Sequence, residues 1–182
     1  MGLFTQSRHI APRRAAAFRA DSTAVTELDR ILKANESYTA SPMAGPPAKR
    51  LCIVTCMDAR IDPLAAFGLD LGDTHVIRNA GGRVTDDTIR SVVLSAHALG
   101  TREFGVIHHT RCGVQTTNDA IKEALAGLDV GHIDFLAFDD LDQSVRDDVQ
   151  ALVDTKLLPP DAAVWGGVYD VDTGQLRIVV EP

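Results

Sequence analysis

Two short stretches of the sequence place metal-binding and charged side chains directly after apolar runs. The stretch CIVTCMDAR is apolar up to Cys56, which is followed at alternate positions by Asp58 and Arg60. The stretch FGVIHHTRC ends on His109, which lies 53 positions after Cys56, and on Cys112. If both runs are parallel strands, their carboxyl ends lie at the same edge of a sheet, where the sites of open α/β sheets form. We therefore expect the two groups to meet in space.

Cys56, His109 and Cys112 together form a soft donor set of two sulfurs and one nitrogen. Such a set suits zinc. Cys112 follows His109 by three residues, a spacing that lets one turn present both side chains to a single ion. Three protein ligands leave the fourth position of a tetrahedral zinc ion open for chemistry. The sequence therefore predicts a zinc site of the catalytic kind.

Cys52 is the other cysteine that could close this site and make it structural. If the segment is a strand, Cys52 and Cys56 lie about 13 Å apart at ~3.3 Å per residue. Two thiolates on one zinc ion have sulfurs within about 4.6 Å of each other. A helix here would reverse the argument, but the β-branched residues between the two cysteines disfavour a helix. We predict that Cys52 is a packed core thiol.

Asp58 and Arg60 are interpreted together. A carboxylate beside a zinc ion with an open position tends to occupy that position. A guanidinium two residues away can hold the carboxylate in a bidentate pair and keep it off the metal. Held in this way, Asp58 can accept a hydrogen bond from a zinc-bound water. The alternative is an ordinary surface ion pair with no part in chemistry.

The elements that must position these residues alternate between strand and helix. Short apolar β-branched runs predict strands, and capped segments with helical spacing predict helices. This alternation predicts an α/β fold with a mainly parallel central sheet of about four strands plus an antiparallel edge strand, flanked by helices. Strands are expected within 50–56, 73–82, 103–109 and 162–180, and helices within 62–70, 85–100, 116–127 and 140–156.

The N-terminal part is expected to be a separate helical arm. An amphipathic helix is predicted over residues 22–35, with Asp21 or Ser22 as its cap, followed by a Pro/Gly-rich connector. The arm and linker would occupy residues 1–48, and a single α/β domain would occupy residues 49–182.

Composition limits the partners and the compartment. The chain has 182 residues and a net charge of -7, which argues against nucleic-acid and membrane partners. The chain has only three cysteines, a small and odd number that argues against a disulfide scaffold. We therefore expect a reducing, cytoplasmic compartment. The first twenty residues carry four arginines and no acid; in a eukaryotic source they would suit organelle targeting.

Two motifs of the sequence resemble those of a known family. The motif C-M-D-A-R, followed by H-T-R-C-G, is similar to the C-x-D-x-R and H-x-x-C motifs of the β-class carbonic anhydrases. The stretches VIRNAGG and TDDTIRS resemble the small, short-C-terminus branch of that family. The resemblance runs roughly from residue 49 to residue 127. That branch also includes enzymes that hydrolyse carbonyl sulfide or carbon disulfide.

The resemblance implies a role for each matching residue. Asp58 and Arg60 would be the catalytic dyad. Gly113 would hold a backbone N–H near the substrate. Apart from the resemblance, the stretch NAGG (79–82) lacks the G-x-G-x-x-G spacing of a dinucleotide site, so Gly81 and Gly82 are expected to let the backbone come close to the metal pocket. Gly81 and Gly113 are the substrate-binding candidates. The implied ligands of one zinc ion per chain are Cys56, His109 and Cys112.

The implied activity is hydration of carbon dioxide to bicarbonate by zinc-bound hydroxide. The first alternative is hydrolysis of carbonyl sulfide to hydrogen sulfide and carbon dioxide on the same zinc site. A second alternative, from another class, is a non-catalytic zinc-stabilised interaction domain, which would need neither Asp58 nor Arg60. The family is built from dimers with the site at the subunit interface, so we expect a homodimer, or a tetramer, with residues 22–35 covering the partner.

Overall fold

The structure is a computed structural model that describes residues 25–182. The described residues divide into two units, 25–42 and 43–182. In the second unit, the connector is tied to the turn that precedes Thr74: the backbone N–H of Ala48 donates to the Gly72 carbonyl, and that of Lys49 donates to the Asp73 carbonyl. The domain start at residue 49 remains a prediction.

The first unit contains one described helix, α1 (Glu27–Glu36). Its N-cap is Thr26, which accepts from the backbone N–H of Asp29, while the Asp29 carboxylate accepts from the backbone N–H of Thr26. This capping box starts the helix at Glu27. The predicted start at residue 22 and the predicted caps at Asp21 and Ser22 lie outside the described residues, but residues 25 and 26 are not helical.

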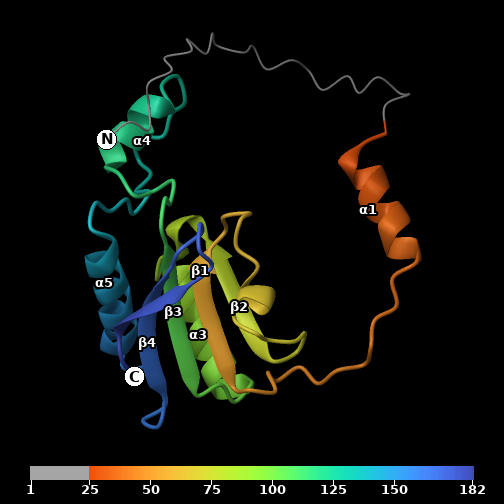
Figure 1. Cartoon of the computed structure of the whole chain (residues 1–182). Helices are drawn as coiled ribbons and strands as arrows, with labels where there is room; N and C mark the ends of the chain where they lie inside the picture. The colour runs from red at the N-terminus through yellow and green to blue at the C-terminus, as the bar shows by residue number, and fades with distance from the viewer. Residues whose placement is uncertain (1–24) are drawn as a thin grey trace. The chain divides into compact units, whose positions relative to one another are not determined.

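The second unit is built on one five-stranded sheet with the order β2-β1-β3-β4-β5 (Figure 1). Four of its strands are parallel, and β5 pairs antiparallel with β4 at one edge. The predicted fold class is confirmed. The strands are β1 (Leu51–Cys56), β2 (Thr74–Asn79), β3 (Glu103–His109), β4 (Ala163–Tyr169) and β5 (Leu176–Val180).

Helices connect the parallel strands, and each begins at a side-chain cap. Asp62, Thr85, Thr117 and Asp140 each accept hydrogen bonds from backbone N–H groups of the first helical turn, which satisfies donors that have no partner inside the helix. Asp62 and Thr85 are the first residues of the ranges 62–70 and 85–100 in which helices were predicted, and each is the N-cap of its helix. The helices are α2 (Pro63–Ala66), α3 (Asp86–Ala98), α4 (Asn118–Ala124) and α5 (Leu141–Asp154).

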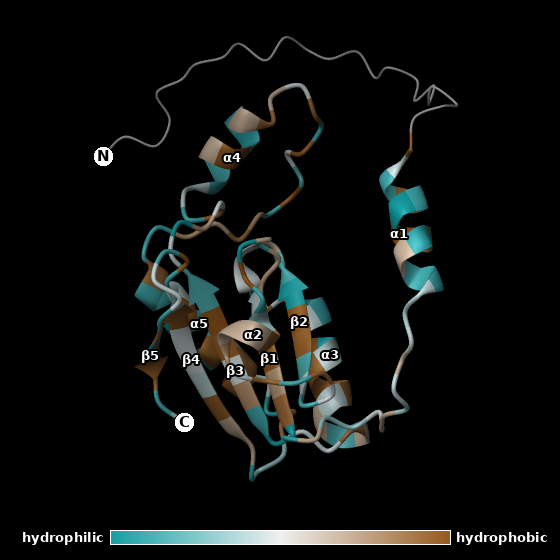
Figure 2. Ribbon diagram, turned by 45° about the vertical axis from the view of Figure 1, so that its right-hand side comes forward, coloured by the Kyte–Doolittle hydropathy of each residue, from teal (hydrophilic) through white to brown (hydrophobic). Residues whose placement is uncertain are grey.

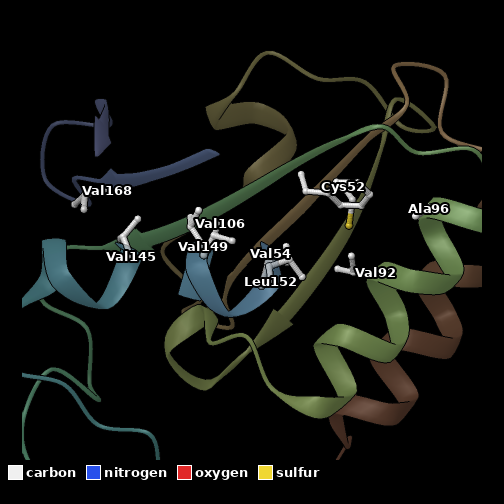
Figure 3. Close-up of a cluster of buried hydrophobic side chains, with 10 residues drawn as sticks. Cys52, Val54, Val92, Ala96, Val106, Val145, Val149, Leu152 and Val168 are labelled. Atoms are coloured by element: carbon white, nitrogen blue, oxygen red, sulfur yellow. The ribbon is translucent and has the colours of Figure 1, made fainter. Parts of the chain in front are cut away.

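The core lies on both faces of the sheet. Helices α3 and α5 cover one face, where aliphatic side chains of β1, β3 and β4 pack against them (Figure 3). A second cluster, on the other face, contains Ile53, Ile61, Ile107 and Tyr169, and it also includes Cys56 and Cys112. The apolar residues follow the central strands, as the hydropathy colouring shows (Figure 2). The expected ligand cysteines therefore lie at the edge of a packed core.

Within residues 25–182, none of the helices has the length and apolar character needed to cross a membrane.

Candidate metal centre

The two strand ends meet as expected. Cys56 is the last residue of β1 and His109 is the last residue of β3, and these strands are hydrogen-bonded neighbours in parallel orientation. Cys112 lies in the turn that follows β3. One ligand atom from each of these three buried residues lies within 4.8 Å of the other two. The group is therefore compact enough for all three side chains to bind one ion.

The donor geometry fits zinc. The sulfurs of Cys56 and Cys112 are 4.0 Å apart, within the roughly 4.6 Å that two zinc-bound thiolates can span. His109 Nδ1 lies 2.9 Å from the Thr110 carbonyl; because a carbonyl only accepts, Nδ1 carries the proton and Nε2 keeps its lone pair. Among the described residues, His109 Nε2 is the one buried side-chain N or O atom without a hydrogen-bond partner. A metal ion would satisfy it.

The contact between the two thiols shifts the pKa of each in opposite directions, an arrangement that favours a bound cation. The pKa of Cys56 is lowered, chiefly because Cys112 hydrogen-bonds to its sulfur. The nearby His109 side chain and the backbone N–H groups of Asp58 and Gly81 lower it further. The pKa of Cys112 is raised by the same contact and by burial. Two thiolates this close repel each other, so both become anionic only when a cation lies between them.

Asp58 and Arg60 form a bidentate pair beside these three residues. Arg60 Nε donates to Asp58 Oδ1 at 2.9 Å, and Arg60 Nη2 donates to Oδ2 at 2.7 Å. The guanidinium holds the pKa of Asp58 well below its usual range, so the carboxylate is ionised at neutral pH. Asp58 Oδ2 lies 3.9 Å from His109 Nε2. The carboxylate is thus anionic, clamped, and close to the expected metal position.

Two further arginines hold the loops that carry this pair. Arg78 donates to the carbonyls of Cys56 at 2.9 Å and Asp58 at 2.6 Å, which fixes the turn after β1. Arg60 Nη2 also donates to the carbonyl of Arg111 at 3.1 Å, and the Arg111 side chain forms an ion pair with Asp172. The dyad is therefore tied to both loops of the site. The role of Arg78 was not predicted, although its position at the end of a strand was the signal for it.

The glycines expected near the site differ in their surroundings. Gly81 is buried with φ +83°, and a Cβ there would lie 2.7 Å from Val114 Cγ2, so a side chain would both strain the backbone and clash. A Cβ on Gly82 would lie 2.9 Å from the backbone nitrogen of Cys56. Gly113 has no neighbour within 4 Å of an added Cβ. The backbone thus passes close to Cys56 at Gly81 and Gly82, and it is open at Gly113.

Cys52, His75, His97 and His108 are not part of the ligand cluster. Cys52 is fully buried on the α3 side of the sheet, and burial raises the pKa of its thiol to about 12, as expected for a core thiol. His108 is buried on the side facing α5, where it contacts Ser144. His75 contacts the Ser95 hydroxyl, and His97 is exposed.

Comparison with known proteins decides the family. The family model described as carbonic anhydrase matches residues 51–134. Beta-carbonic anhydrase 1 of Mycobacterium tuberculosis is 38% identical over 161 residues, covering 85% of this chain and 99% of that protein. The crystal structure of a carbonic anhydrase from Streptococcus mutans matches with a TM-score of 0.80 and 46% identity, covering 86% of this chain and 99% of that chain.

The chain belongs to the β-carbonic anhydrase family. Its likeness extends to enzymes with another substrate, because the carbon disulfide hydrolase of Saccharolobus solfataricus is 33% identical, covering 82% of this chain and 87% of that protein. The zinc predicted from the sequence is the metal of β-carbonic anhydrases, and the Cys-His-Cys cluster is able to hold it.

Proposed function

We propose that this chain hydrates carbon dioxide to bicarbonate at a zinc ion held by Cys56, His109 and Cys112. The observation that carries the proposal is the unpartnered Nε2 of buried His109, close to two cysteine sulfurs. The chemistry that zinc supplies when bound in this way is the activation of a water molecule at neutral pH.

Asp58 is proposed to orient the nucleophile rather than to store a proton. Hydration of carbon dioxide to bicarbonate releases one proton. Because Arg60 holds the pKa of Asp58 far below neutrality, this carboxylate stays ionised, and the released proton must pass to water and buffer. An ionised carboxylate only accepts hydrogen bonds, so Asp58 can direct the O–H of the attacking water and its lone pair.

The two glycines have separate proposed roles. Gly113 follows Cys112, and a Cβ added there would meet no atom within 4 Å. Its backbone N–H is proposed to donate to a substrate oxygen. The backbone N–H of Gly81 hydrogen-bonds to the Cys56 sulfur and lowers its pKa. Because Gly81 has no side chain, it is also proposed to keep the substrate side of the site open. Both assignments are parts of the proposal.

Hydrolysis of carbonyl sulfide is the second candidate function. The similarity to carbon disulfide hydrolases favours it, and the same three metal ligands would serve either reaction.

We expect carbon dioxide hydration to be the main activity, with kcat/KM on the order of 10⁴ M⁻¹s⁻¹ or higher. Stopped-flow measurement of proton release from carbon dioxide tests this, and sulfide release from carbonyl sulfide is assayed on the same zinc-loaded protein. Protein stripped of metal by a chelator is the control for both. Negligible hydration together with zinc-dependent sulfide release would reverse the order of the two functions.

A homodimer is the second part of the proposal. The apolar side chains of α1, and that of Val25 just before it, are exposed: Val25, Leu28, Ile31 and Leu32 are each 56–64% exposed. An apolar helix face of this kind is stabilised by packing against another surface. Strand β2 is also an edge of the sheet in the single chain. We propose that α1 covers a second copy of the chain, with a tetramer as the larger alternative, and that the enzyme works in the reducing cytoplasm, where its thiols stay free.

We expect light scattering to give the mass of a dimer at micromolar concentration. The double variant Leu28→Glu/Ile31→Glu should shift the protein toward monomer, because it places charges on the apolar face of α1. Lys33→Glu, a charge change on the polar side of the same helix, is the control and should stay dimeric. A fully active wild-type monomer would contradict this part of the proposal.

A further inference from the structure

A buried ion pair lies on the sheet face opposite His109. Asp148 of α5 accepts from Arg83 Nε at 2.6 Å and from Arg83 Nη2 at 3.3 Å. It also accepts from His108 Nε2 at 3.0 Å, because a carboxylate offers no proton of its own. The side chains of Arg83, Asp148 and His108 are only 12%, 6% and 0% exposed. None of these groups takes part in the proposed reaction.

Arg83 connects this pair to the segment that touches Cys56. It directly follows Gly81 and Gly82. At Gly82 the chain packs against the backbone at the end of β1, and the backbone N–H of Gly81 lowers the pKa of Cys56 by hydrogen bonding to its sulfur. Asn79 fixes the same turn, because its side chain accepts from the Arg83 N–H at 2.7 Å and donates to the Arg83 carbonyl at 2.7 Å. Any movement of Arg83 is therefore passed to the backbone beside Cys56.

Arg83 also holds the loop that lies against the turn after Cys112. Its Nη1 donates to the carbonyl of Leu136 at 2.6 Å, and its guanidinium lies 5.4 Å from the centre of the Phe138 ring. Phe138 in turn donates its backbone N–H to the carbonyl of Val114 at 3.1 Å. The Val114 backbone N–H hydrogen-bonds to the Cys112 sulfur, which lowers the pKa of that thiol.

His108 provides the link to the third ligand. It precedes His109 in β3, so its contacts with Asp148 and with the Ser144 hydroxyl at 2.8 Å fix the end of that strand. Asp148 is thus joined through one carboxylate to the backbone segments around all three expected ligands.

We propose that Asp148 is a positioning residue for the metal centre, holding the Gly81–Arg83 turn, the end of β3 and the Leu136–Phe138 loop in the arrangement that zinc requires. The inference rests on the proposed metal site. A role in stability alone is a poor explanation, because buried ion pairs seldom stabilise a fold more than apolar residues of similar size would. Outer-shell groups that hydrogen-bond to metal ligands commonly change metal affinity by about 10- to 100-fold, and Asp148 acts one step further out, through the backbone segments next to the ligands.

Asp148→Asn is the primary test. Asparagine keeps the size of the side chain and removes the charge, so Arg83 is left buried without its counter-ion. We expect the folded variant to release zinc to excess chelator about tenfold faster than wild type. We also expect the visible spectrum of the cobalt-substituted protein to change, because the two thiolates and the imidazole no longer meet the metal in the same geometry.

Asp142→Asn is the matched control. Asp142 lies on the same helix and forms an exposed bidentate pair with Arg177, at 2.6 and 2.9 Å. Its removal should leave zinc release and the cobalt spectrum at wild-type values. Arg83→Lys is a milder second variant that keeps the charge balance but loses the fork to Asp148 and Leu136, and it should also release zinc faster.

The outcomes separate this inference from the proposed function. Wild-type protein that binds no zinc would overturn both. Wild-type protein that holds zinc tightly, with unchanged release and spectrum in Asp148→Asn or, where that variant does not fold, in Arg83→Lys, would overturn the inference alone. A lower melting temperature with unchanged metal behaviour would reduce Asp148 to a purely structural residue and would also overturn it.

Discussion

Replacement of Arg60 by alanine is expected to leave about one zinc ion per chain and to lower kcat/KM for carbon dioxide by about 100-fold or more. In the wild type, Arg60 occupies both oxygens of Asp58. Asp58 Oδ2 lies only 3.9 Å from His109 Nε2. Without the guanidinium, an anionic carboxylate this close to a divalent cation should bind it and fill the open position.

The decisive measurement for Arg60→Ala is the coordination of its zinc, by crystallography or X-ray absorption. We expect four protein ligands, with a carboxylate oxygen as the fourth. Retention of near-normal turnover with three protein ligands would make Arg60 a surface partner only, and the interpretation of the Asp58–Arg60 pair would be wrong.

Asp58→Asn is the matched variant. An amide is a much weaker zinc ligand than a carboxylate, so this variant should keep both its zinc and its open position. It should still lose activity by about 100-fold, because the oriented acceptor is gone. The two variants should therefore be inactive for different reasons, one with a closed site and the other with an open site that orients its water poorly.

Much of the fold and of the ligand cluster follows from local sequence. The β-branched apolar runs before Cys56 and His109 predicted strands, and parallel strands bring their carboxyl ends to one edge. Both strands and the closeness of Cys56, His109 and Cys112 are present in the structure. Asp62 and Thr85 each stand directly before an apolar helical pattern, and each caps the helix that follows it.

The start of α1 was harder to predict because several capping side chains lie close together before it. Asp21, Ser22 and Thr26 are all good N-caps, and the choice depends on which of them can form a reciprocal pair. Thr26 and Asp29 form that pair, whereas the cap had been predicted at Asp21 or Ser22.

Contacts between residues far apart in the chain could not be predicted from the local sequence pattern. Arg83 and Asp148 are 65 residues apart, and each looks like an ordinary charged residue at the start or on the face of a helix. Arg111 adopts φ 56°, an uncommon backbone conformation for a residue with a side chain, and only the fold reveals that its carbonyl faces Arg60. These residues support the site through tertiary contacts, so the ligand motifs alone could not identify them.

The metal centre itself is tested by replacing its cysteines one at a time. Cys56→Ser and Cys112→Ser should each lose most of their zinc, because a serine hydroxyl stays protonated at neutral pH and is a poor zinc ligand in place of a thiolate. Cys52→Ser is the matched control. Its thiol is fully buried away from the other two sulfurs, and burial raises its pKa to about 12, so it should not contribute to metal binding.

The most direct measurement is the zinc content per chain of these three variants and the wild type, determined by elemental analysis after dialysis. We expect about one zinc per chain in the wild type and in Cys52→Ser, and nearly none in Cys56→Ser and Cys112→Ser. Full zinc content in both Cys56→Ser and Cys112→Ser, or loss of zinc in Cys52→Ser alone, would contradict the proposed metal centre.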